Sequence, residues 1–174
     1  YIYKLETNSS ASATMKKQEG SYFDTFFNQT FSYDKRNQRY KTTDGFISRF
    51  TQNIPIISDT YTLTNSYDYK TYNQWLGENI LSLGFYLKST NSLNGEDVKL
   101  SDRLYLPSSK LRGFESGKVG PKDGASFIGG NYLSSMNIAT TLPQVLPSLQ
   151  NTNFSLFFDA ANIWGIDYSS TLSD

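Results

Sequence analysis

The sequence predicts an all-β fold of antiparallel strands, and three observations lead to it. Segments of roughly ten residues alternate apolar and polar side chains, which is the period of a β-strand with two different faces. The mean hydropathy is −0.49, although 16% of the residues are Phe, Tyr or Trp. No run of about 18 apolar residues exists, so no transmembrane helix is expected. Two folds satisfy these observations, a membrane β-barrel and a soluble β-sandwich.

Four strands are expected in the first part of the chain. A short one spans Tyr1–Glu6. The second spans Phe23–Tyr33, where aromatic residues alternate with polar ones, although Phe26 breaks the pattern. The third covers Phe46–Ile54 and the fourth Tyr61–Tyr72, each with one apolar and one polar face. Strands of about 9–11 residues are long enough to cross a bilayer when they are tilted.

Three further strands are expected, at Asn79–Lys88, Asn131–Thr141 and Asn153–Trp164. In the last of these, Asp159 shares a face with Phe157, and the opposite face is apolar. On a strand in a membrane, the face with Asp159 would line the lumen, because a charge that faces lipid costs a few kcal/mol.

The connections between these strands differ in length. Asp34–Gly45, Asn73–Asn79 and Leu142–Thr152 are expected to be turns, whereas Thr90–Gly130 is a loop of roughly forty residues without periodicity. Short turns at one end and longer loops at the other are typical of outer-membrane barrels. Composition and alternation alone still leave the sandwich open.

The composition excludes several kinds of functional site. The sequence has no cysteine and no histidine, which excludes disulfides and thiolate metal sites and removes the commonest general base and metal ligand. Sixteen basic residues balance 16 acidic ones, so the net charge does not indicate nucleic-acid binding. No G-x-S-x-G nucleophile motif is present. We therefore expect no catalytic residue, no metal and no cofactor.

The long loop carries the most specific motif. Leu111-Arg112-Gly113-Phe114 is followed by Gly120-Pro121, and Gly129-Gly130-Asn131 then opens the next strand. In this order, the series resembles the BamA family, the central component of the bacterial barrel-assembly machinery. Ser32–Asn37 and Phe154–Trp164 also resemble a periplasmic turn and a strand of that family.

The resemblance implies an antiparallel transmembrane β-barrel rather than a sandwich. Residues 1–174 would be an internal part of the carboxy-terminal barrel domain, about six or seven of roughly 16 strands. Amino-terminal periplasmic domains, early strands and the last strands would lie outside the sequence. The long loop, residues 90–130, would fold into the lumen.

The resemblance also implies which residues anchor this loop. In the family, the arginine of the motif contacts acidic groups on the inner wall, so Arg112 is expected to bind Asp159, next to Phe157. An arginine fork holds a carboxylate with two hydrogen bonds, which a lysine cannot do. The family often places a glutamate on the preceding strand as well; by resemblance, Ala139 stands at that position here, which would leave Asp159 as the acid that holds the arginine.

The other residues of the motif are expected to shape the loop. Gly113 would allow a backbone conformation or a close approach that a side chain forbids. Phe114 would pack the loop tip against the lumen wall. Gly120-Pro121 would turn the chain, and Gly129-Gly130 would lead into the strand.

By resemblance, the protein would fold and insert β-barrel proteins into the bacterial outer membrane without enzymatic chemistry. Its expected partners are unfolded barrel clients, accessory lipoproteins of the assembly complex and the lipid bilayer, with no nucleic acid. The alternative is a related barrel that secretes or translocates a protein partner, or a transport porin. An enzyme, the third possibility, is disfavoured by the composition.

Overall fold

The computed structural model describes residues 2–77, 79–142 and 154–167. It is built almost entirely from β-strands. The elements are β1 (Ile2–Leu5), α1 (Ala13–Lys16), β2 (Gly20–Asp34), β3 (Gly45–Ser58), β4 (Thr62–Leu76), β5 (Asn79–Ser92), β6 (Lys122–Asp123), β7 (Ser126–Phe127), β8 (Tyr132–Thr141) and β9 (Ser155–Trp164). All the strands expected from the sequence are present, so the predicted all-β fold is confirmed.

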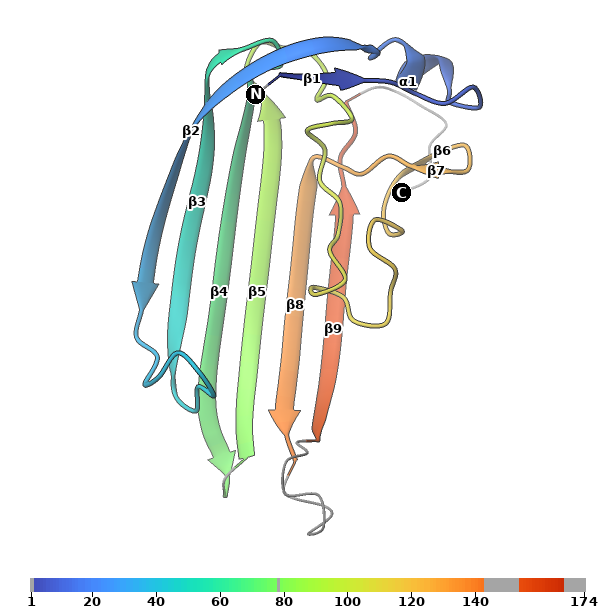
Figure 1. Ribbon diagram of the computed structural model, residues 1–174. Coiled ribbons are helices and arrows are strands. Elements are labelled where there is room, and N and C mark those ends of the chain that lie inside the picture. The colour runs from blue at the N-terminus through green and yellow to red at the C-terminus, as the bar shows by residue number, and fades with distance from the viewer. Residues whose placement is uncertain (1, 78, 143–153, 168–174) are drawn as a thin grey trace.

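Seven strands form one sheet in the order β1-β2-β3-β4-β5-β8-β9, and every neighbouring pair is antiparallel. Figure 1 shows them side by side as a single curved sheet. Each strand pairs with the next one of this sheet along the chain, as in an up-and-down barrel wall. Among the described residues, β6 and β7 form the other sheet, and its two-stranded size excludes a sandwich of comparable layers.

The two faces of the sheet have opposite character. On the outer face, large apolar side chains such as Phe31, Leu87 and Phe158 are exposed. On the inner face, polar residues pair across strands; the hydroxyls of Thr30 and Thr51, for example, lie 3.1 Å apart. Exposed apolar area of this extent marks a surface that another apolar phase covers. The alternation is that of a barrel wall between lipid and a polar lumen.

Two connections differ from expectation. Asn73–Asn79 was expected to be a turn, but β4 and β5 keep pairing through most of it, as far as Leu76↔Asn79. The long loop contains the small β6–β7 hairpin, although no periodicity indicated it. Ladder hydrogen bonds from the neighbouring strand extended the strands into residues with turn chemistry. The expected turn Leu142–Thr152 lies almost wholly outside the described residues.

A short helix was not expected from the sequence. The helix α1 lies between β1 and β2, and its N-cap residue Ser12 accepts a hydrogen bond from the backbone N–H of Met15, whose side chain is buried. No helix in the described part of the chain is long and apolar enough to span a bilayer.

The turn between β2 and β3 is held by its own side chains. Arg36 donates two hydrogen bonds to the Asp34 carboxylate, at 2.9 and 2.7 Å. Lys35 N–H donates to the carbonyl of Phe46 at 2.8 Å. Gly45 has φ of +96°, and a Cβ there would lie 2.2 Å from the carbonyl oxygen of Lys35. The turn therefore tolerates glycine alone at this position.

This geometry predicts the effect of Gly45→Ala in the full-length protein. The added methyl meets backbone, so the turn must move, and we expect a loss of at least about 3 kcal/mol in the free energy of unfolding in detergent. Gly95→Ala is the matched control, because Gly95 also has positive φ but nothing lies within 4 Å of its Cβ position. The Gly95→Ala variant should lose about 1 kcal/mol in the free energy of unfolding. Equal losses in denaturant titrations would contradict the prediction.

Candidate functional site

The long loop returns to the inner face of the sheet and meets the middle of β9. Arg112 donates to the Asp159 carboxylate from Nε at 2.7 Å, from Nη2 at 2.6 Å and from its backbone N–H at 3.0 Å. The Asp159 side chain is only 2% exposed, whereas that of Arg112 is 37% exposed. The pair is therefore bidentate, with the carboxylate buried and one side of the guanidinium open.

Phe157 completes this contact from the same strand. It lies two residues before Asp159 and therefore on the same face of β9. The Cζ of Arg112 lies 3.8 Å from the centroid of the Phe157 ring, within the range of a cation–π contact. The hydrogen bonds to Asp159 raise the pKa of Arg112 above its ordinary value, so the guanidinium stays charged.

The neighbouring strand supplies a second partner that the sequence did not reveal. Asn137 in β8 pairs directly with Asp159. Its Nδ2 donates to Asp159 at 2.8 Å and to the backbone carbonyl of Lys110 at 3.0 Å. Asn137 thus joins the wall carboxylate to the loop backbone. Its position on the polar face of a predicted strand was the available signal.

The register also shows where Ala139 lies relative to Asp159. Ala139 pairs with Phe157, two pairs along the ladder from the Asn137–Asp159 pair. Strand alternation repeats every two residues, so Asn137 and Ala139 share a face, and the pattern alone does not distinguish them. Among the described residues, Asp159 is the acid that Arg112 binds, and Asn137 occupies the place beside it.

A second ion pair connects the loop to β4. Lys110 lies 2.9 Å from the Asp68 carboxylate, and its Nζ is 4.3 Å from the centroid of the Tyr86 ring on β5. Asp68 and Tyr86 pair directly across the two strands. Lys110 and Arg112 are two residues apart in the loop, yet they bind carboxylates on different strands of the wall, β4 and β9. Neither Asp68 nor Lys110 was singled out from the sequence.

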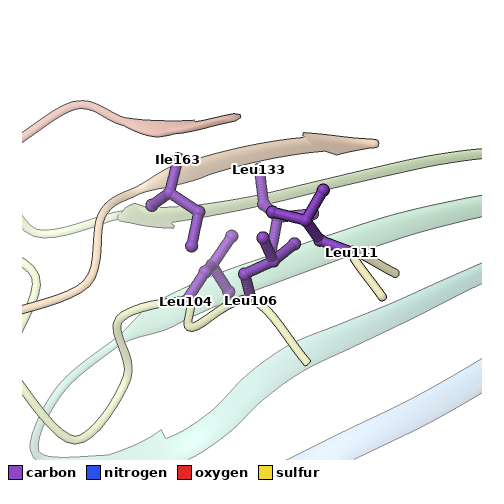
Figure 2. Close-up of a cluster of buried hydrophobic side chains, with 5 residues drawn as sticks. All are labelled: Leu104, Leu106, Leu111, Leu133 and Ile163. Atoms are coloured by element: carbon purple, nitrogen blue, oxygen red, sulfur yellow. The ribbon is translucent and has the colours of Figure 1, made fainter. Parts of the chain in front are cut away.

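An apolar cluster holds the same loop to the wall. Figure 2 shows loop residues Leu104, Leu106 and Leu111 beside Leu133 of β8 and Ile163 of β9. All five are buried. Burying a side chain of this size contributes about 1.5–3 kcal/mol, so the cluster is a substantial part of the anchoring. Leu111 belongs to the expected motif; the apolar character of its contact on a mostly polar face was not expected.

Gly113 and Phe114 follow the anchored residues in the loop. Gly113 has φ of +86°, which supplies the predicted backbone conformation, but nothing lies within 4 Å of its Cβ position. Phe114 is 58% exposed. More than half of the Phe114 side chain is thus exposed among the described residues, and its packing against the lumen wall stays a prediction.

Two of the remaining motif glycines, Gly120 and Gly130, lie where the loop touches β9. A Cβ at Gly120 would lie 3.0 Å from Cβ of Ile163, and one at Gly130 would lie 2.6 Å from the carbonyl oxygen of Trp164. Gly130 also exchanges backbone hydrogen bonds with Leu104, and Pro121 is buried. Gly129 has φ of +67°. Close backbone approach thus explains why these positions carry small residues.

The described residues contain no group of three or more His, Cys, Asp or Glu side chains that could hold a metal ion. The contacts described above fix the loop to the inner face of the sheet.

Comparison with known proteins places the chain in a family. The model of the Omp85 superfamily domain matches residues 2–174. The chain belongs to the Omp85 superfamily. A crystal structure of BamA from Haemophilus ducreyi, lacking POTRA domains 1-3, shares the fold of this Omp85 chain with a TM-score of 0.75 and 22% identity, covering 93% of this chain and 33% of that one. The predicted membership of a BamA-like family is confirmed.

Two curated relatives of this Omp85 chain are fungal. A SAM50-like protein of Schizosaccharomyces pombe is 43% identical over 68 residues, 37% of this chain and 14% of that protein. The Sorting assembly machinery 50 kDa subunit of Saccharomyces cerevisiae is 23% identical over 167 residues, 91% of this chain and 34% of that protein. The chain thus spans about a third or less of the length of these relatives.

The ion pair predicts how Arg112 variants of the full-length protein behave. Arg112→Ala leaves the Asp159 carboxylate without its bidentate guanidinium partner. We expect the free energy of loop docking to fall by about 1.5–3 kcal/mol. Trypsin cleavage after Lys118 should accelerate accordingly. Arg112→Lys should be intermediate, since an ammonium lacks the planar fork. Glu115→Gln, on an exposed residue of the same loop, is the control. Wild-type cleavage rates in Arg112→Ala would contradict the anchoring role.

The apolar cluster makes a separate prediction. Leu106→Ala should leave a cavity beneath the loop and cost about 2–5 kcal/mol. The same trypsin assay should report faster cleavage, and the effect should persist at high salt, which weakens charge interactions but not apolar burial. Leu93→Ala, at an exposed position at the start of the loop, is the matched control. Equal rates for both variants would exclude the cluster as an anchor.

Proposed function

We propose that the protein folds and inserts β-barrel proteins into an outer membrane, without catalysing a covalent reaction. Membership of the Omp85 superfamily supports this, as do the likeness to BamA in fold and the relative named as a subunit of a sorting assembly machinery. Its partners would be unfolded barrel clients, the accessory subunits of an assembly complex and the lipid bilayer. The described residues would be an internal part of the barrel wall and its inward loop, within a longer protein.

The anchored loop is the observation that carries the proposal. Arg112 and Lys110 bind carboxylates on β9 and β4, and three leucines pack on β8 and β9. The loop therefore cross-links strands from the inside of the wall. A protein that opens part of its barrel to receive new strands by edge pairing needs the rest of the wall to remain rigid. We propose that the loop provides that rigidity.

Two outer membranes, that of bacteria and that of mitochondria, are candidates for the location of the protein. The resemblance to BamA led us to expect a bacterial outer membrane with accessory lipoproteins. Both curated relatives are fungal, and one of them reaches 43% identity in the matched segment, compared with 22% for the bacterial structure. We therefore propose the mitochondrial outer membrane, with the bacterial one as the alternative. Fractionation of the source cells with an antibody against the protein distinguishes the two.

Assembly of client barrels in cells that depend on the Arg112→Ala protein tests the function. Losing about 1.5–3 kcal/mol of loop anchoring should slow assembly at least about fivefold. The readout is the rate at which pulse-labelled clients acquire the heat-sensitive mobility of folded barrels. Lys118→Ala, which removes a loop cation outside the anchor, should assemble clients at the wild-type rate.

Two outcomes would contradict this proposal. Normal client assembly after complete depletion of the protein would exclude an assembly function. If the depleted cells assembled clients normally but failed to export one soluble protein, the secretion alternative would replace it.

A further inference from the structure

A small cavity lies between the anchored loop and the inner face of the sheet. Its volume is about 190 Å³. The wall contributes residues from β4, β5 and β8, and the loop contributes the segment that includes Lys110 and Arg112. Three cationic side chains line the cavity, those of Lys70, Lys110 and Arg112, but only one acidic side chain, that of Asp68. The side chains that line the cavity therefore carry a net positive charge in the absence of a ligand.

The cations differ in how far their charge is already matched. Lys110 is paired with Asp68, and Arg112 with Asp159 behind it. Lys70 has no carboxylate within 4.0 Å in the part of the chain that the structure describes; its Nζ lies 5.0 Å from the centroid of the Tyr72 ring. Within the same residues, Nη1 of Arg112 donates no hydrogen bond, since Nε and Nη2 carry the contacts to Asp159. One positive charge and one guanidinium edge therefore remain available.

Small residues leave the space in front of these groups open. Ala139 and Gly84 line the cavity without long side chains, and the hydroxyls of Ser82 and Ser109 border it. A Cβ at Gly84 would meet only ordinary contacts, at 3.7 Å from Asn137 and 3.9 Å from Lys70. The polar lining disfavours an apolar ligand, and the excess positive charge disfavours a cation. A small anion matches both the size and the charge.

We propose that this lumen cavity binds an oxyanion, a carboxylate or phosphate group, between the ammonium of Lys70 and the free edge of Arg112. Guanidinium and ammonium groups bind both anions through charge-assisted hydrogen bonds. The anion has two sources, an acidic side chain of a polypeptide in the lumen or free phosphate. In either case, it joins β4 to the loop arginine and reinforces the loop against the wall. The site is defined by the cavity and does not depend on the proposed function.

Isothermal titration of the full-length protein in detergent at low ionic strength tests the site. Inorganic phosphate should bind saturably to the wild type, and Lys70→Gln should weaken the binding at least about tenfold. Lys88→Gln is the matched control: Lys88 lies on the same strand as Gly84, at an inward position, but does not line this cavity. Its affinity for phosphate should equal that of the wild type.

A blocked aspartate peptide, titrated in the same way, separates the two sources. Tighter binding of the peptide than of phosphate identifies an acidic side chain as the occupant, and the reverse identifies free phosphate. Ala139→Glu provides a second test, because it places a carboxylate of the protein's own in the cavity. It should abolish the binding of both probes while trypsin cleavage of the loop stays as slow as in the wild type.

The proposal is overturned if neither probe binds the wild type saturably. It is also overturned if Lys70→Gln and Lys88→Gln weaken binding equally, since the effect would then be the general charge of the lumen. If Lys70→Gln lacks the heat-sensitive mobility of a folded barrel, Ala139→Glu decides: retained phosphate binding in that variant excludes the cavity.

Discussion

A carboxylate buried on the inside of a membrane-type β-wall requires neutralisation, and the arrangement of the long loop follows from this constraint. Asp159 is almost fully buried and receives three hydrogen bonds from Arg112 and one from Asn137. Desolvating a carboxylate without such partners costs several kcal/mol. The loop therefore docks at one height on β9, and the positions of Lys110 and Leu111 follow from that of Arg112.

Two kinds of interaction hold the loop, and they contribute different properties. The leucine cluster supplies most of the affinity, because apolar burial is large but insensitive to direction. The ion pairs with Asp159 and Asp68 require defined geometry, so they select one docked position among those that bury the same apolar area. A loop held in both ways resists displacement by a polypeptide in the lumen, which suits a protein whose proposed clients are unfolded chains.

The fold is shared with BamA at only 22% identity because few of its determinants need particular residues. A wall strand needs an apolar side chain outward and a polar or small one inward, and many sequences satisfy that pattern. Contacts at the loop are more demanding. A bidentate fork for Asp159 and the close backbone approach at Gly130 each restrict the position to one residue type.

The sequence by itself determined the strands and their faces, because the two-residue period depends only on local chain geometry. It indicated Arg112 and Asp159 through the resemblance of the loop motif. The register was decided by the tertiary structure: Asn137, not Ala139, lies opposite Asp159, since hydrogen bonds between β8 and β9 set an offset that alternation leaves open. The buried leucines, the Lys110–Asp68 pair and the exposure of Phe114 were likewise decided by the tertiary structure. These features depend on where the long loop docks on the wall. The docking position is fixed by contacts between residues distant in sequence, which a loop without periodicity does not reveal.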